Sequence, residues 1–280
     1  FLRFNVHFAE RIHAEQPLSP PGQWNRMDHR PLEGFVYAIS PFNFTSIGGN
    51  LSSSPAILGN VAVWKPAATA VYSNYFLMRV FLEAGLPPGV INFIPGSAAA
   101  VSARLLADRH LAGIHFTGST EVFQALWQQV GQNLAGYAGY PRLVGETGGK
   151  DFIVAHASAD ADALATAIVR GGFEYQGQKC SAASRAYVPS NLWLRVRERL
   201  VEMLSRVRMG DPAVFRNFMG AGIDRPAFDK IAAYIDEARR APGVTIVGGG
   251  GRGGREGRFH RPAGAPAGAP DGPRPRRPRR

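Results

Sequence analysis

The only thiol of the chain belongs to Cys180, in the segment GGFEYQGQKCSAASR over residues 171–185. Glycine and other small residues around it let a ligand approach the sulfur closely. A thiolate is a strong nucleophile, and the positive charge of the adjacent Lys179 would favour this ionised form. The segment predicts a nucleophilic cysteine; the alternative is a buried cysteine that acts only as a small apolar residue.

Two further residues could assist such a nucleophile. Glu146 lies in RLVGETGGKDFIV, where Gly148 and Gly149 predict a turn between two strand-like runs. A carboxylate on a flexible turn can act as a general base. Asn43 follows a strand-like run in ISPFNF, and its amide could donate a hydrogen bond to a developing oxyanion. The alternatives are a glutamate at the surface of a turn and an asparagine that only completes a loop.

A third set of residues could bind an anion. Lys65 ends the apolar run NVAVWK, and FTGST passes from a strand through Gly118 into a helix that begins near Ser119. The exposed N–H groups at a helix start, together with a serine hydroxyl, suit a phosphate. This region has no G-x-G-x-x-G, so the usual dinucleotide fingerprint is absent.

Short apolar runs alternate with amphipathic stretches along most of the chain, a pattern typical of a mainly parallel sheet covered by helices. In such folds, ligands bind at the carboxyl ends of the strands. The predicted strands are 34–40, 60–65, 90–95, 113–118, 151–155, 184–190 and 244–249; the predicted helices are about 69–84, 98–107, 120–134, 160–175, 191–207 and one that opens at Asp224 and Pro226.

The composition is that of a globular protein, with 280 residues, 45% hydrophobic and 19% charged. The net charge of +11 points at first to nucleic acid, but residues 251–280 hold nine Arg against one Glu and one Asp, and so carry most of it. This Pro- and Gly-rich tail is expected to be disordered. A shifted reading frame or the end of a fragment is the favoured origin, with an Arg-rich nucleic-acid tail as the alternative.

Other classes of protein are disfavoured by what the sequence lacks. One cysteine allows neither an internal disulfide nor a cysteine-based metal site, and no paired histidines suggest a metal. No apolar run reaches the length of a membrane span. We therefore expect no metal, no membrane association and a reducing compartment. The Arg-rich, Lys-poor composition favours a bacterial cytoplasm over a mitochondrial matrix.

Five motifs occur in the order PFNF, WKPA, FTGS, ETGGK and GQKC. In this order and at these spacings they resemble the aldehyde dehydrogenase superfamily. The segments EGFVYAISPFNFTSIGGNL, EAGLPPGVINFIPG and FEYQGQKCSA are most similar to its L-glutamate γ-semialdehyde (1-pyrroline-5-carboxylate) dehydrogenase branch. The resemblance implies a Rossmann-like α/β cofactor-binding domain and NAD-dependent oxidation of a small-molecule aldehyde to glutamate in proline catabolism.

The resemblance also assigns roles to individual residues. Cys180 would attack the aldehyde carbonyl, Asn43 and the Cys180 N–H would hold the oxyanion, and Glu146 would activate the water that hydrolyses the thioester. Ser181 matches a position that contacts the substrate carboxylate. The positions that match cofactor-lining residues of the family are Ser40, Lys65, Gly118 and Ser119.

The match implies an NAD-binding domain over 1–145, a partial catalytic domain over 146–250 and the tail over 251–280. The family pattern goes on to a Glu-Ile-Phe-Gly-Pro segment and an oligomerisation hairpin that this sequence lacks, so we expect a truncated chain without turnover. Full-length family members form homo-oligomers. Ala68 stands where the family often has an acidic residue, so the choice of NAD over NADP rests on the branch alone.

Three other functions stay open at this point. A basic nucleic-acid-binding protein could act through its Arg-rich tail, although no zinc finger or RNP-type aromatic motif accompanies it. A cysteine hydrolase could use Cys180 with a histidine that folding brings near. The chain could also belong to an aldehyde dehydrogenase with a different substrate.

Overall fold

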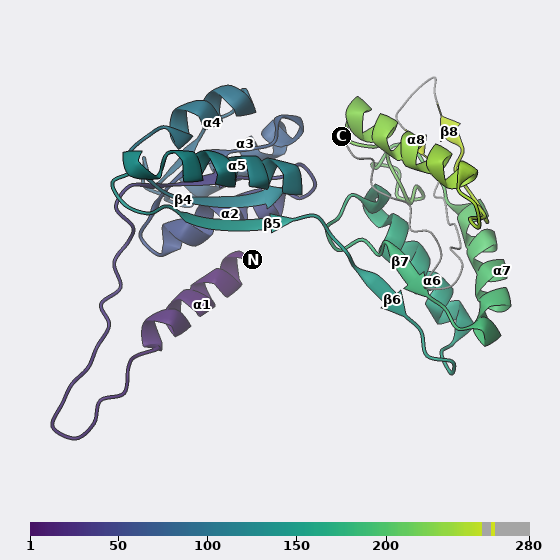
Figure 1. Ribbon diagram of the computed structural model, residues 1–280, viewed down its shortest axis with the longest axis horizontal. Coiled ribbons are helices and arrows are strands. Elements are labelled where there is room, and N and C mark those ends of the chain that lie inside the picture. Colours follow the sequence, from purple (N-terminus) through teal and green to yellow (C-terminus); the bar gives the residue numbers. More distant parts are fainter. Residues whose placement is uncertain (254–258, 261–280) are drawn as a thin grey trace. The chain divides into compact units, whose positions relative to one another are not determined.

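The computed structural model describes residues 1–253 and 259–260 and confirms the predicted α/β class (Figure 1). The chain divides into two units, Phe1–Gly148 and a second one that starts at Gly149. The motifs predict domain boundaries after residues 145 and 250. Most of the predicted disordered tail, residues 254–258 and 261–280, lies outside the described residues.

The first unit is built on a sheet of five parallel strands in the order β3-β2-β1-β4-β5. The central strands are buried on both faces, which is why they read as continuous apolar runs in the sequence. The four strands predicted in this unit are confirmed, and the fifth, β5, occupies an edge. The strands are β1 (Phe35–Ile39), β2 (Val61–Lys65), β3 (Ile91–Phe93), β4 (Leu111–Gly118) and β5 (Arg142–Thr147).

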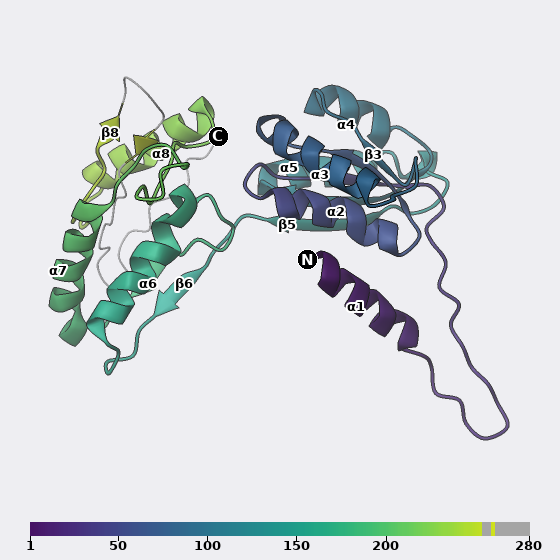
Figure 2. The ribbon, with the colours of Figure 1, turned by 180° about the vertical axis from the view of Figure 1, so that it is seen from behind.

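Helices cover both faces of this sheet. Figure 1 shows α5 in front of the sheet, and Figure 2, from behind, shows α2 and α3. Along β1, Tyr37 packs with Leu126 of α5, whereas the next residue, Ala38, packs with Met78 of α3. The helices of the unit are α1 (Leu2–Ala14), α2 (Thr45–Ile57), α3 (Val71–Glu83), α4 (Ala98–Leu106) and α5 (Thr120–Gln132), with short 3-10 turns at Ala68–Ala70 and Leu134–Gly136.

Helix α2 was not predicted, because its sequence TSIGGNLSSSPAI holds two glycines and a proline. Packing explains why it forms. A Cβ at Gly48 would lie 2.4 Å from the Asn74 Oδ1 atom, and one at Gly49 would lie 2.6 Å from Leu77 Cδ2. Residues that disfavour an isolated helix thus let α2 approach α3 closely, and tertiary contact outweighs local propensity.

The connections of the sheet change sides between β1 and β4. The chain leaves β1 through α2 on one face and leaves β4 through α5 on the other, although β1 and β4 are neighbours. Doubly wound sheets bind their ligands beyond the carboxyl ends of two strands whose connections diverge in this way.

The second unit packs two helices against a short parallel pair of strands. Leu164 and Val169 of α6 meet Val196 and Leu200 of α7 in a common core, and Ile153 of β6 packs against it. Helix α8 begins as predicted, with the Asp224 carboxylate accepting a hydrogen bond from the Ala227 N–H at 2.8 Å. The elements are β6 (Phe152–Val154), α6 (Ala161–Phe173), a 3-10 turn (Glu174–Gly177), β7 (Arg185–Tyr187), α7 (Ser190–Arg206), α8 (Arg225–Arg240), β8 (Arg252–Gly253) and β9 (Phe259–His260).

The strand predicted over residues 244–249 is wrong. The chain turns at the start of this segment, with the Val244 N–H donating to the Ala241 carbonyl at 3.3 Å, and only Val244 and Gly248 make isolated β-bridges. A strand needs a continuous hydrogen-bonded ladder, which two separate bridges do not provide. No helix within the described ranges is long and apolar enough to cross a membrane.

We predict that His115 makes the stability of the first unit depend on pH. Its Nδ1 lies 3.0 Å from the Leu51 carbonyl oxygen of α2, and burial lowers the pKa of the ring. The unfolded chain, with a histidine pKa of about 6.5, therefore binds more protons than the folded one. The contribution of His115 is complete above that value and is lost as the pH falls toward the lower pKa of the folded state.

Urea denaturation between pH 7.5 and pH 5, to be run on the parent and on His115→Asn, tests this. The asparagine keeps an N–H for the Leu51 carbonyl but has no ring to protonate, so the acid-induced loss of stability should shrink. His110→Asn, at an exposed histidine of the same unit, should leave the loss unchanged. Equal pH dependence in the parent and in His115→Asn would contradict the prediction.

Candidate active site

Ser40 and Lys65 lie side by side at the carboxyl ends of β1 and β2. Ile39 is paired with Lys65 in the sheet, and the Ser40 N–H donates to the Lys65 carbonyl at 3.2 Å. The Ser40 hydroxyl is buried and accepts a hydrogen bond from the Trp64 indole at 2.9 Å. The strand geometry thus fixes both predicted cofactor residues at the carboxyl edge of the sheet, close to the point where its connections change sides.

Lys65 is buried, with an exposed fraction of 5%, and burial lowers the pKa of its ammonium group. Within the described part of the chain, no carboxylate or other side chain pairs with that group. Burial of most of the side chain weakens the solvation of its charge. A ligand that brings hydroxyl or anionic oxygens to this position would offset that cost.

Gly118 and Ser119 end β4 and begin α5. The Ser119 hydroxyl accepts a hydrogen bond from the Val122 N–H at 3.3 Å, so it caps the helix. A Cβ at Gly118 would lie 2.6 Å from the Phe116 ring, whose stack with Phe123 fills the adjoining space. The strand–glycine–helix turn predicted from FTGST is therefore present, with its serine hydroxyl engaged in capping.

Asn43 and Glu146 lie at the same edge of the sheet. Asn43 is half-buried in the bend between β1 and α2. Glu146 is exposed on strand β5, paired with Thr117 of β4. The prediction that Glu146 lies on a turn is wrong, because β5 runs to Thr147 and the left-handed turn starts at Gly148, with a φ of 71°.

In the second unit, the backbone around Cys180 packs directly against the start of the unit. A Cβ at Gly149 would lie 1.9 Å from the Cys180 carbonyl oxygen, so only glycine fits there. The Ala183 N–H donates to the Gly171 carbonyl at 2.8 Å and fixes the residues that follow the thiol. The ETGGK and GQKC motifs therefore meet through Gly149, a contact that sequence reasoning missed, since the spacing of two motifs carries no distance.

Lys179, predicted to favour the thiolate, is engaged elsewhere. Its ammonium donates to the Glu174 carboxylate at 2.9 Å, and Arg170 bonds the same carboxylate at 2.7 Å. Lys179, and to a smaller extent Arg170, hold the pKa of Glu174 below its usual value. The charge of Lys179 is thus compensated within its own loop. Cys180 itself is half-buried, and Ser181 beside it is exposed.

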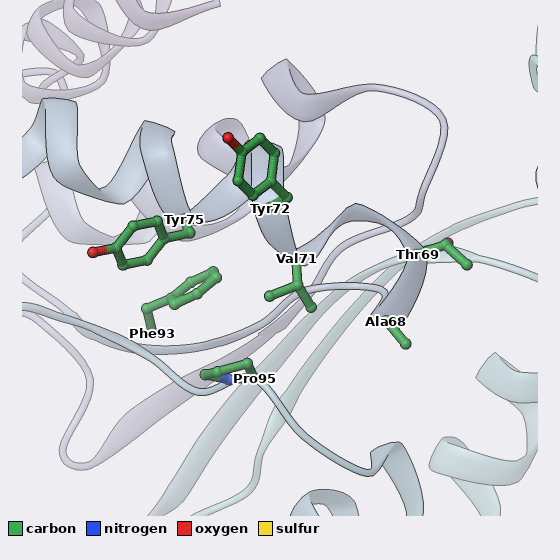
Figure 3. A pocket seen from close by; sticks show the side chains of 7 residues that line it. All are labelled: Ala68, Thr69, Val71, Tyr72, Tyr75, Phe93 and Pro95. Carbon is green, nitrogen blue, oxygen red and sulfur yellow. The ribbon is translucent and has the colours of Figure 1, made fainter.

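A pocket of about 610 Å³ opens beyond the carboxyl ends of β2 and β3 (Figure 3). Tyr72 and Tyr75 of α3 stand on one side of it, and Phe93 and Pro95 on the other. Its lining holds no charged side chain and includes Ala68, the position where the family pattern often has an acid. Sequence reasoning missed the two tyrosines, which sit on a helix with no motif.

Six of the predicted site residues share the carboxyl edge of the first unit's sheet, namely Ser40, Asn43, Lys65, Gly118, Ser119 and Glu146. Cys180 and Ser181 belong to the second unit. Across residues 1–253 and 259–260, no group of three or more His, Cys, Asp or Glu could hold a metal ion.

The aldehyde dehydrogenase family model matches residues 1–263. The chain belongs to the aldehyde dehydrogenase family. It is 51% identical over 253 residues to the mitochondrial delta-1-pyrroline-5-carboxylate dehydrogenase of Dictyostelium discoideum, covering 89% of this chain and 45% of the relative. The corresponding enzyme of Mus musculus is 49% identical over 251 residues, with 89% and 45% covered.

Solved structures of this aldehyde dehydrogenase family agree with the fold. The delta-pyrroline-5-carboxylate dehydrogenase of Mycobacterium tuberculosis bound with NAD superposes with a TM-score of 0.92 at 53% identity, covering 96% of this chain and 50% of that one. The NAD-bound enzyme from Thermus gives 0.83 at 33% identity, with 93% and 50% covered. The chain thus spans about half the length of the relatives it matches.

We predict that Gly149→Ala destabilises the second unit. The new methyl group would fall on the Cys180 carbonyl, so the backbone must shift, at a cost of about 1–3 kcal/mol. Urea denaturation measures the loss. Gly131→Ala in α5, where nothing lies within 4 Å of the new Cβ, should instead stabilise the chain by about 0.5–1 kcal/mol. If Gly149→Ala matched that control, the close packing would be refuted.

Proposed function

We propose that this chain supplies the cofactor-binding and nucleophile-bearing parts of an NAD-dependent L-glutamate γ-semialdehyde dehydrogenase. The enzyme would oxidise the open-chain form of 1-pyrroline-5-carboxylate to glutamate. The observation that carries the proposal is the largely buried Lys65 side chain, which has no ion-pair partner among the described residues and ends a strand at the carboxyl edge of the sheet, in a chain 53% identical to a relative crystallised with NAD.

The residues at the carboxyl edge fit a dinucleotide. Lys65 would bond the adenosine ribose hydroxyls, and the positive end of α5 at Ser119 would lie near the pyrophosphate. Gly118 would let the backbone approach the cofactor, and Ser40 would line it. When bound, NAD would supply the acceptor for the hydride. The uncharged pocket that includes Ala68 offers no carboxylate to select NAD against NADP, so that preference rests on the relatives.

Cys180 would provide covalent catalysis. Its thiolate forms a C–S bond to the aldehyde carbon while the carbonyl electron pair moves onto oxygen. The Asn43 amide and the Cys180 N–H donate to that oxyanion. Loss of the hydride from the same carbon leaves a thioester on Cys180. Glu146 then takes a proton from water, whose oxygen attacks the thioester and releases the carboxylate product and the thiolate.

The resemblance to the semialdehyde dehydrogenase branch suggests a role for Ser181. Exposed beside the nucleophile, it would donate its hydroxyl to the α-carboxylate of the substrate. The relatives from Dictyostelium discoideum and Mus musculus are mitochondrial. For this chain we propose a reducing compartment, with a bacterial cytoplasm favoured on composition, and no nucleic-acid partner; the homo-oligomer is expected of full-length family members, whose oligomerisation hairpin this sequence lacks.

We predict that Lys65→Met weakens NAD binding at least about tenfold, because a charged hydrogen bond contributes about 1.5–3 kcal/mol. Affinity in the parent should also fall as the pH rises through the lowered pKa of Lys65, at a lower pH than for an ordinary lysine, since only the ammonium form makes a charged hydrogen bond. Isothermal titration calorimetry with NAD at several pH values measures both. Lys230→Met, at an exposed lysine of the second unit, serves as the control. Unchanged affinity in Lys65→Met would remove Lys65 from the site.

We predict that aldehyde oxidation depends on Cys180. NADH formation from 1-pyrroline-5-carboxylate and NAD is to be followed for the chain alone and for the chain joined in register to the remaining half of the Mycobacterium tuberculosis relative. The joined protein should turn over, and Cys180→Ser should abolish turnover while NAD still binds. Turnover that survives Cys180→Ser, or that proceeds without NAD, would refute the proposed mechanism.

A further inference from the structure

The loop that leads to Cys180 is held in an unfavourable backbone conformation. After α6 ends, Tyr175 and Gln176 have φ values of 56° and 58°, and Gly177 follows with 66°. Only glycine adopts this left-handed region without strain, and non-glycine residues stay there only when their surroundings hold them. A Cβ at Gly177 would also lie 2.8 Å from the Gly172 carbonyl oxygen. Some interaction must therefore maintain the turn.

Two carboxamides tie this loop to the backbone of residues 220–223, hereafter the anchor segment. The Gln176 Oε1 accepts from the Gly220 N–H at 3.0 Å, and its Nε2 donates to the Ala221 carbonyl at 3.1 Å. The Gln178 Oε1 accepts from the Ile223 N–H at 2.9 Å. The Gln176 amide thus both accepts from and donates to the backbone of the anchor segment, as a peptide group does in a β-ladder.

The loop is also closed on itself. The Lys179 ammonium bonds the Glu174 carboxylate at 2.9 Å and so joins its two ends. Cys180 is the next residue, and its carbonyl packs against Gly149. The two glutamines connect this closed loop to the anchor segment through three hydrogen bonds to its backbone.

We propose that Gln176 and Gln178 are positioning residues for Cys180: their carboxamides hold the strained loop 174–179 on the anchor segment and thereby fix where the thiol is presented. Neither glutamine needs to touch the substrate. That Cys180 is the nucleophile rests on the proposed function. That the two glutamines determine the position of its thiol can be tested without it.

The single cysteine makes the thiol directly measurable. Alkylation by iodoacetamide is to be followed by intact mass on the full chain from pH 6 to pH 10, which yields the thiol pKa and the rate constant of the thiolate. Gln176→Met and Gln178→Met keep the side-chain length and remove the amides. We expect each to raise the thiolate rate constant about fivefold or more, because a released loop exposes a half-buried sulfur.

Two control variants separate positioning from general loss of stability. Val196→Ala opens a cavity in the core of the same unit and should leave the alkylation rate within twofold of the parent under native conditions. Gln128→Met, at an exposed glutamine of α5, should do the same. In the joined protein, Gln176→Met should lower kcat at least about tenfold without changing the KM for NAD.

The proposal is overturned if both methionine variants alkylate within twofold of the parent, or if Val196→Ala accelerates alkylation as much as they do. Should Gln176→Met fail to fold, Gln178→Met alone decides by the same criteria. Faster alkylation in a joined protein that shows no turnover would leave the positioning intact and refute only the proposed dehydrogenase function.

Discussion

One steric constraint governs the structure: at several places a neighbouring group fills the space that a Cβ would need. Gly48 admits the Asn74 side chain between α2 and α3, and Gly145 admits the ring of Phe123 between β5 and α5. Gly149 admits the carbonyl of Cys180. Because a parallel sheet is buried on both faces, its helices must lie close to it, and Gly145 lets α5 approach β5. Gly149 instead lets the backbone at Cys180 approach the start of the second unit.

Lys65 is buried and Lys179 is half-buried, and their different surroundings give the same residue type two different roles. Lys179 is joined to Glu174, which shares its charge with Arg170, so its role is to close a loop. Lys65 has no such partner in the described part of the chain and ends a central strand. The ammonium group of Lys179 therefore stabilises a loop, whereas that of Lys65 is available to a ligand.

Sequence alone predicts the strand–helix alternation well, because the central strands are apolar throughout and periodic helices follow them. It fails where local propensity and tertiary contact disagree. The glycines and proline of α2 disfavour a helix that packing against Leu77 nevertheless stabilises. Residues 244–249 form only two isolated β-bridges, at Val244 and Gly248, in place of the predicted strand. Spacing placed Glu146 and Cys180 in motifs but held no distances, so the contacts of Gly149 and of the two glutamines could be found only in three dimensions.

The burial of Lys65 gives a reason why a lysine suits this position better than an arginine. A guanidinium is bulkier than an ammonium group and keeps its proton at any pH a protein meets. The pKa of the lysine can instead respond to its surroundings: burial lowers it in the free protein, and oxygens of a bound ligand would raise it again. Ligand binding at this position would therefore depend on pH in a way that an arginine would not show.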